Sequence, residues 1–233
     1  MSDKVCLIAG VGPGTGAALA RRFAAGGYKV AMLARVAERL VALERTVPGT
    51  SAYPCDVTDP AQIAATCDAV ERDLGAPSVV VHNAVGGTFG SFLDLKPEVL
   101  NQNFQTNTMV LLSLAQRFVP GMIAKGDGAL IVTGNMSARR GRVDLAGLAP
   151  TKAAQRILAE AIAREVGPKG VHVAYVVIDA VIDTLSARDR LKAKPSDAFI
   201  KPAAIADEIW HLAHQDRSAW SFNVEIRPFR EVW

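Results

Sequence analysis

The chain has 233 residues, 50% of them hydrophobic and 21% charged, with a formal net charge of +3 at pH 7. This length fits one α/β domain with an ample core over residues 1–233, and the small charge gives no reason to expect a nucleic-acid partner. No apolar run approaches the roughly 18 residues that cross a bilayer, so no membrane partner is expected either.

The first predicted element is a strand that ends in a glycine-rich turn. The apolar run at residues 5–9 leads into Gly10-Val11-Gly12-Pro13-Gly14-Thr15-Gly16, and a helical pattern over Thr15–Ala25 follows at once. Glycine lets the chain turn sharply and lets a phosphate approach backbone amides. The helix start offers unpaired N–H groups and a positive dipole end. We expect a dinucleotide cradle; a tight connection without a ligand is the alternative. The candidate contacts are Gly10, Gly12, Gly14, Thr15 and Gly16.

Strands and helices then alternate along the chain. Strand-like runs lie at Tyr28–Ala34, Ser51–Cys55, Ser78–His82, Ala129–Thr133, Val171–Ile178 and, more weakly, Phe222–Ile226. Helical patterns lie at Ala37–Thr46, Pro60–Leu74, Pro97–Lys125, Ala149–Val166 and Pro202–His214. Short strands separated by helices favour parallel pairing with right-handed crossovers. The sequence therefore predicts an α/β, Rossmann-like doubly wound parallel sheet of about seven strands with helices on both faces. A ligand should lie beyond the carboxyl ends of the strands.

The end of the second strand bears on the choice of coenzyme. A carboxylate there would hydrogen-bond the ribose hydroxyls and repel a 2′-phosphate. This chain has Arg35 instead, with Arg39 one helical turn further on, and guanidinium groups bind phosphate through paired N–H donors. We expect a preference for NADP(H) over NAD(H); an ordinary basic helix start is the alternative.

These motifs resemble the short-chain dehydrogenases/reductases over nearly the whole chain. Gly10, Gly14 and Gly16 match the family's Gly-x-x-x-Gly-x-Gly, and Asp56-Val57 its Asp-Val that contacts adenine. The segment His82-Asn83-Ala84-Val85-Gly86 resembles its Asn-Asn-Ala-Gly, with histidine in place of the first asparagine. The resemblance further implies roles for Asn107 in a water-mediated proton relay, for Lys152 as the family lysine, and for Ile182 and Thr184 beside the nicotinamide amide.

Two family residues of the catalytic group are replaced. The resemblance places the proton-donating tyrosine four residues before the lysine, where this chain has Leu148, and the carbonyl-binding serine at Asn135. Leucine has no proton to donate. The tyrosines are Tyr28, Tyr53 and Tyr175, and none lies in a segment expected to reach the site.

A branch of the family resembles the chain more closely. It shares a Thr-Gly-x-x-Ser-x-Arg-x-Gly run, here residues 133–141, and often has a residue other than tyrosine before the lysine. Thr133 of this run joins the coenzyme-binding candidates, and Ser137 provides a hydroxyl near the site. The substitution of tyrosine is thus expected to be a trait of a subgroup.

Three functions remain open. The first is an oxidoreductase with an altered proton donor, in which Lys152 supplies positive charge, Asn135 binds a developing oxyanion, and the substrate is a small molecule with an activated C=C or C=O bond. The second is an NADP(H)-binding sensor or partner protein without turnover. The third, a lyase or dehalogenase, is disfavoured because such relatives keep the tyrosine and remodel the glycine loop.

Other candidate residues have structural alternatives. His82 is either an acid or a packed residue at a strand end, and Arg139, Arg140 and Arg142 either bind an anionic substrate or lie in a solvated loop. A basic segment over residues 188–201 is a lid or a polar flap. The tail from Trp220 to Trp233, with exposed-looking Phe229 and Trp233, either covers the site or crosses to another subunit.

The last predictions concern subunit assembly and cellular location. Small residues in the helical patterns at 97–125 and 149–166 fit the family's dimer interface, so a homodimer or homotetramer is expected. The start Met1-Ser2-Asp3-Lys4 lacks a signal peptide's apolar segment, and Cys6, Cys55 and Cys67 lack metal-ligand spacing. A cytoplasmic protein with reduced thiols and no metal is the expectation.

Overall fold

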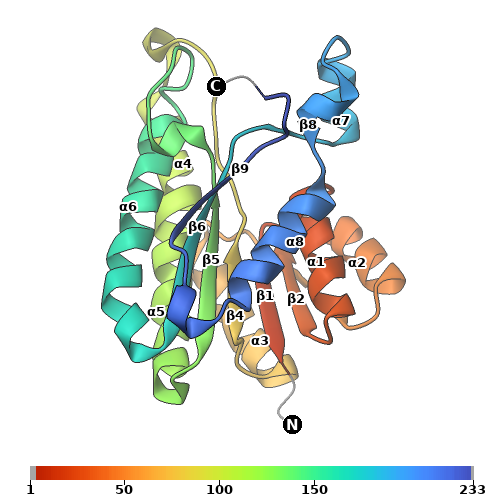
Figure 1. Cartoon of the computed structure of the whole chain (residues 1–233), viewed down its shortest axis with the longest axis vertical. Helices are drawn as coiled ribbons and strands as arrows, with labels where there is room; N and C mark the ends of the chain where they lie inside the picture. Colours follow the sequence, from red (N-terminus) through yellow and green to blue (C-terminus); the bar gives the residue numbers. More distant parts are fainter. Residues whose placement is uncertain (1–3, 232–233) are drawn as a thin grey trace.

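The structure, a computed structural model, describes residues 4–231 and is built around one parallel sheet (Figure 1). The strands, in order across it, are β3 (Thr50–Pro54), β2 (Lys29–Ala34), β1 (Val5–Ala9), β4 (Val79–His82), β5 (Gly128–Gly134), β6 (Val171–Ile178) and β9 (Asn223–Ile226). All neighbouring strands are parallel. The predicted doubly wound sheet of seven strands is confirmed.

Helices cover both faces of the sheet, and each face has its own apolar core. One layer contains α1 (Thr15–Ala25), α2 (Ala37–Thr46) and α8 (Pro202–Ala213). The other contains α3 (Pro60–Leu74), α5 (Val110–Lys125) and α6 (Ala149–Val166). Strands β4 and β6 are buried along their whole length, as expected for strands covered on both sides.

The strand order reverses between β1 and β4, and this reversal positions the site. Ala9 at the end of β1 pairs with Leu33 of β2 on one side and with His82 of β4 on the other. The chain leaves β2 and β4 in opposite directions, so a crevice opens beyond the carboxyl end of β1. The glycine turn, the loop after β4 and the end of β5 all meet there.

The helix predicted over Pro97–Lys125 is present, but it is not a regular α-helix throughout. The segment forms α4 (Pro97–Phe104), a π-helical turn (Gln105–Met109) and α5. Apolar residues continue at helical spacing through the turn, so the pattern hides it. A π-helical turn leaves carbonyl groups outside the regular ladder and is frequent at functional sites. Here it contains Asn107, one of the candidate site residues, with its side chain buried.

A small lid that the strand pattern does not reveal follows β6. It consists of β7 (Val181–Ile182), α7 (Leu185–Arg190) and β8 (Phe199–Ile200), with β7 and β8 paired in parallel. Two-residue strands carry no alternation of polar and apolar residues, so sequence periodicity does not detect them.

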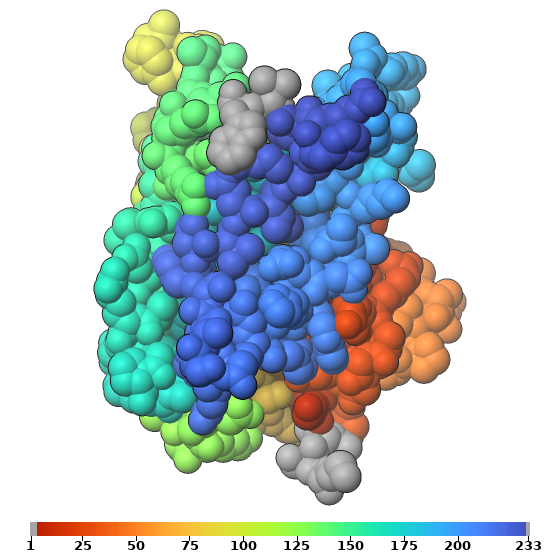
Figure 2. Space-filling model, in the orientation of Figure 1, coloured from red at the N-terminus to blue at the C-terminus, as the bar shows by residue number. Residues whose placement is uncertain are grey.

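The tail after β9 lies against this lid, as Figure 2 shows for the dark blue and light blue segments. Lys194 Nζ of the lid is 3.0 Å from the Glu231 carboxylate, and Arg230 pairs with Asp197 at 2.9 Å. Within the described residues the tail thus covers the end of its own fold. Trp233 and the first three residues lie outside the described part of the chain.

Within residues 4–231, no helix is long and apolar enough to cross a membrane.

Candidate active site

The glycine turn is held against the loop that follows β4. Gly10 has a φ of +100°, and a Cβ placed on it would lie 2.3 Å from the backbone nitrogen of Ala84. A side chain is therefore excluded here both by conformation and by space. Around Gly12, by contrast, a Cβ would meet nothing within 4 Å. The turn is thus tightly packed on its inner side and open on its outer side, as a phosphate cradle requires.

The start of α1 has polar groups without partners in the described structure. Gly14 precedes the helix and has no side chain to cap it, so the N–H groups of Thr15 and Gly16 remain available to an anion, whereas the Ala17 N–H donates to Gly12 O at 3.0 Å. The Thr15 hydroxyl oxygen is buried and has no hydrogen-bond partner among residues 4–231. A buried hydroxyl costs free energy unless it is hydrogen-bonded. A diphosphate at the helix start would satisfy both groups, so the residues present fit a dinucleotide.

The lid reaches the same turn. A Cβ on Gly14 would lie 3.0 Å from the Thr184 methyl carbon and 3.5 Å from a methyl carbon of Ile182. The Thr184 hydroxyl caps α7 by accepting a hydrogen bond from the Ala187 N–H at 3.2 Å. Two candidate residues from the end of the chain are therefore brought beside the turn at its beginning.

Arg35 and Asp56 follow the neighbouring strands β2 and β3. Both Arg35 and Arg39 are exposed. The Asp56 carboxylate accepts hydrogen bonds from the Thr58 backbone N–H at 3.0 Å and from its hydroxyl at 2.7 Å. These bonds hold the pKa of Asp56 below its usual value, with a smaller contribution from the Arg35 charge. The two strand ends thus carry a cation and a hydrogen-bond acceptor, as the sequence prediction of an adenosine site requires. Val57 follows Asp56 and is half-buried.

Asn83 and Asn107 fix the loop after β4. The Asn83 amide donates to Gly10 O at 2.7 Å and accepts from the Thr133 hydroxyl at 3.2 Å, tying together the ends of β1, β4 and β5. Asn107 accepts from the Gly86 N–H and donates to Gly86 O at 2.6 Å and to the Thr151 hydroxyl at 2.8 Å. Both side chains are thus committed to the protein, and they set the shape of the crevice.

Lys152 is almost fully buried on α6. Its ammonium group donates to Thr133 O at 3.2 Å and to the Gln155 side-chain oxygen at 3.0 Å, and only 3% of the residue is exposed. Burial lowers its pKa from 10.5 to about 7, because the charged form loses its hydration. Lysine at this position therefore exchanges a proton near neutral pH.

His82 completes this network from β4. Because the Gln155 oxygen accepts from Lys152, the Gln155 amide N–H donates to His82 Nδ1, at 2.9 Å. His82 Nε2–H then donates to Thr106 O of the π-helical turn, at 3.1 Å. His82 is fully buried, and burial followed by the Lys152 charge lowers its pKa to about 3. Neutral His82 is thus a structural residue, and the interpretation of it as an acid finds no support.

Tyr175 approaches Lys152 from the interior of the protein, which its place in an apolar strand pattern does not indicate. Its hydroxyl lies 3.4 Å from both the Lys152 carbonyl oxygen and the Gln155 side-chain oxygen. The ring packs under Gly134, where a Cβ would collide with it. Tyr175 is fully buried between the sheet and α6, and burial raises its pKa well above 10. It supports Lys152 from inside the core and does not enter the crevice.

Leu148 occupies the first position before α6, one turn ahead of Lys152. It is 3% exposed, and its side chain lies under the loop after β4, where a Cβ on Gly87 would be 3.1 Å from one of its methyl groups. The place implied for a phenol therefore holds an apolar side chain packed against glycine.

Asn135 and Ser137 lie in the turn after β5. The Asn135 side-chain oxygen accepts from the Ser137 N–H at 3.2 Å, which leaves the Asn135 amide N–H₂ as the donor end. Ser137 is 6% exposed. Further along, the Arg139 guanidinium pairs with Glu225 of β9. Gln155 and Tyr175 were missed by sequence analysis, and no motif marks either of them.

Comparison with known proteins gives the family. The family model for short chain dehydrogenases matches residues 4–194, so the chain belongs to that family. D-erythrulose reductase from Gallus gallus is 30% identical over 171 residues, which cover 72% of this chain and 67% of that protein. Homologues and neighbours of this kind are oxidoreductases.

Solved structures agree with the fold. A metagenomic short-chain oxidoreductase in complex with NADP superposes with a TM-score of 0.85 at 28% identity, covering 98% of both chains. The NADPH-bound short-chain oxidoreductase from Pseudomonas aeruginosa PAO1, described as containing an atypical catalytic center, gives a TM-score of 0.86 at 25% identity over 99% of both chains. The chain is therefore similar over its full length to proteins that bind this coenzyme.

Proposed function

We propose that this protein is an NADP(H)-dependent oxidoreductase in which no tyrosine serves as the proton donor, acting on a small molecule with an activated C=C or C=O bond. The proposal depends on two features found together: an open glycine turn with the unpartnered Thr15 hydroxyl, and the buried Lys152 one helical turn after Leu148. The coenzyme-bound relatives support it.

When bound, the coenzyme supplies or accepts a hydride. The chain's own residues position the coenzyme and stabilise the charge that develops on the substrate. The glycine turn and the start of α1 hold the diphosphate, and Thr184 and Ile182 close over it. Lys152, with a pKa of about 7, holds positive charge in a water-poor region and can release a proton near neutral pH. The free amide N–H₂ of Asn135 can donate to an oxygen on which negative charge develops.

A preference for activated substrates follows from Leu148. Losing a positioned general acid costs on the order of 10²–10⁴ in rate, and this loss falls most heavily on simple ketones, whose alkoxide needs a proton. An enoyl thioester or a quinone delocalises the charge that the hydride brings, so it depends less on a nearby acid.

The experiment is a single-turnover measurement of NADPH oxidation by enoyl thioesters, quinones and ketoses, D-erythrulose included. Oxidation by the first two classes at rates at least about 10² above the ketoses is expected. NADPH that binds but is oxidised by none of them would favour a coenzyme-binding protein without turnover. Failure to bind either coenzyme would contradict both functions.

The Arg35→Asp variant tests the coenzyme preference. We expect its affinity for NADPH to fall by about 10- to 100-fold, because a charge-assisted hydrogen bond worth about 1.5–3 kcal/mol is replaced by repulsion. Its affinity for NADH, which lacks the 2′-phosphate, should change little. Arg45→Asp, the same charge change near the other end of α2, is the control. Titration by coenzyme fluorescence measures both, and equal affinities for NADPH and NADH in the unaltered protein would contradict the preference.

A homo-oligomer also remains a proposal. Ile157 of α6 is 59% exposed and Met109, at the end of the π-helical turn, is 41% exposed; exposed apolar side chains of this kind are consistent with a surface that packs against another subunit.

A further inference from the structure

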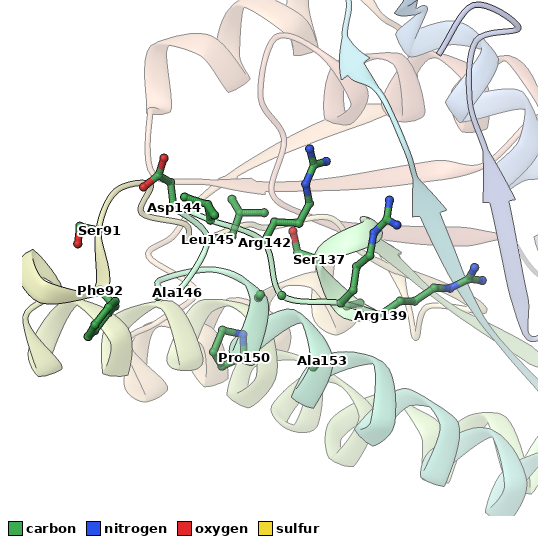
Figure 3. A pocket seen from close by; sticks show the side chains of 15 residues that line it. Ser91, Phe92, Ser137, Arg139, Arg142, Asp144, Leu145, Ala146, Pro150 and Ala153 are labelled. Atoms are coloured by element: carbon green, nitrogen blue, oxygen red, sulfur yellow. The ribbon is translucent and has the colours of Figure 1, made fainter. Parts of the chain in front are cut away.

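A cavity of about 810 Å³ lies on the outer side of the loop between β5 and α6. Figure 3 shows it above the first turn of α6, where Pro150 and Ala153 face it, with Phe92 at one end and the arginine-bearing loop at the other. Lys152, Leu148 and Asn135 do not line it. The cavity therefore adjoins the proposed active site and shares only Ser137 with the residues described there. Its size is in the range of small-molecule sites.

The charge of the cavity wall is strongly positive. Arg139, Arg140 and Arg142 line it, opposed by one acid, Asp144. Arg139 is engaged by Glu225. Arg140 and Arg142 are exposed and have no ion pair or side-chain hydrogen bond with any of the described residues. Two guanidinium groups on one short loop thus have their donor capacity unused.

Ser137 is an independent sign of a ligand. It is 6% exposed, and its hydroxyl has no hydrogen-bond partner among residues 4–231, although its backbone N–H is bound by Asn135. The hydroxyl lines the cavity, and Figure 3 shows it on the side of Arg142. A nearly buried hydroxyl usually finds a partner. Here a ligand oxygen in the cavity would provide one.

The opposite wall is apolar. Phe92 is 71% exposed even though its ring borders the cavity, and Pro150 with the neighbouring alanines of α6 forms the floor. An exposed aromatic ring beside a concave surface is typical of a binding site for an apolar group. The ligand chemistry is therefore amphipathic.

We propose that this cavity binds an organic anion, with its carboxylate or phosphate held by Arg140, Arg142 and the Ser137 hydroxyl and its apolar body lying on Phe92 and Pro150. Bidentate guanidinium contacts suit both anions. The anion is either part of the protein's substrate or a separate ligand, and the chemistry of recognition is the same. The proposal goes beyond the proposed function and does not rest on coenzyme binding.

The test is calorimetric titration with phenyl phosphate, with benzyl alcohol as the neutral probe. The double variant R140Q/R142Q is expected to bind phenyl phosphate at least about tenfold more weakly, since each lost charge-assisted bond costs about 1.5–3 kcal/mol. The double variant R45Q/K125Q makes the same change of net charge on exposed residues elsewhere and should bind as the unaltered protein does. Ser137→Ala should weaken binding several-fold. Benzyl alcohol should bind all variants alike.

Phenyl phosphate can also enter the coenzyme cradle, so the titration is repeated with saturating NADPH. Binding that persists supports the cavity, whereas binding that disappears overturns the proposal. Equal loss in R140Q/R142Q and R45Q/K125Q, or no loss in either, overturns it as well. If NADPH itself does not bind, the affinities of R140Q/R142Q and R45Q/K125Q for phenyl phosphate still show whether the anion binds in the cavity. Competition between phenyl phosphate and the substrate of NADPH oxidation identifies the anion as the substrate's own, and absence of competition identifies a separate ligand.

Discussion

The double variant L148Y/N135S is expected to reduce simple ketones and aldehydes about 10²–10⁴ times faster than the unaltered protein, the usual contribution of a positioned general acid. Leu148 immediately precedes α6 and lies one helical turn before Lys152, whose N–H donates to Leu148 O at 3.1 Å, and both residues are nearly buried. A phenol at residue 148 would therefore lie beside the Lys152 charge, which favours the phenolate and makes proton exchange easier. The measurement is steady-state NADPH oxidation with a panel of carbonyl compounds.

The matched control is L148F/N135S, which has the same ring without the oxygen. Both rings must fit beneath the loop at Gly87, where space is limited, and this overpacking costs about 1–3 kcal/mol of stability. Because the cost is shared, any difference in rate between the two variants comes from the hydroxyl. If the tyrosine and phenylalanine variants reduce ketones at equal rates, the prediction is contradicted, because restoring the proton donor alone is then not sufficient for ketone reduction.

The second large effect concerns Lys152 and pH. Its pKa in the folded protein is about 7, against an ordinary value of 10.5. Between these values the unfolded chain binds one proton more than the folded chain, so stability rises with pH. Relative to Lys152→Met, the free energy of unfolding of the coenzyme-free protein should rise with a slope that approaches about 1.4 kcal/mol per pH unit above pH 7. Because the slope is only half of this at pH 7 itself, the total gain between pH 7 and pH 9 is about 2 kcal/mol.

Urea denaturation of both proteins at the two pH values measures this difference. Methionine also leaves the Gln155 oxygen and Thr133 O without their lysine donor, but that loss does not depend on pH and cancels in the comparison. A difference in stability that stays constant from pH 7 to pH 9 would show that burial does not perturb the lysine.

Features set by local sequence were predicted well. The strand over residues 5–9, the turn from Gly10 to Gly16 and α1 follow from apolar periodicity and from glycine spacing, both of which are properties of adjacent residues. The alternation of strands and helices then leaves few topologies. Lys152 and Leu148 were identified through the resemblance to the family, whose tyrosine and lysine stand four residues apart.

Features set by packing across the chain were not predicted. His82 and Gln155 are 73 residues apart in sequence, and their hydrogen bond depends on how α6 lies against β4. Tyr175 belongs to an apolar strand pattern, and only its position under Gly134 brings the hydroxyl to Lys152. The π-helical turn at Gln105–Met109 adds one residue to a turn without disturbing the apolar pattern.

The ion pairs between lid and tail bear on how the protein should be handled. Glu231 pairs with Lys194 and Arg230 pairs with Asp197. An affinity tag fused after the tail would therefore be attached next to the ion pairs that join the tail to the lid. A tag fused ahead of Lys4 joins the chain at the start of β1, the end of the sheet remote from the lid (Figure 1). Purification for coenzyme titrations is therefore better designed with the tag on the amino-terminal side.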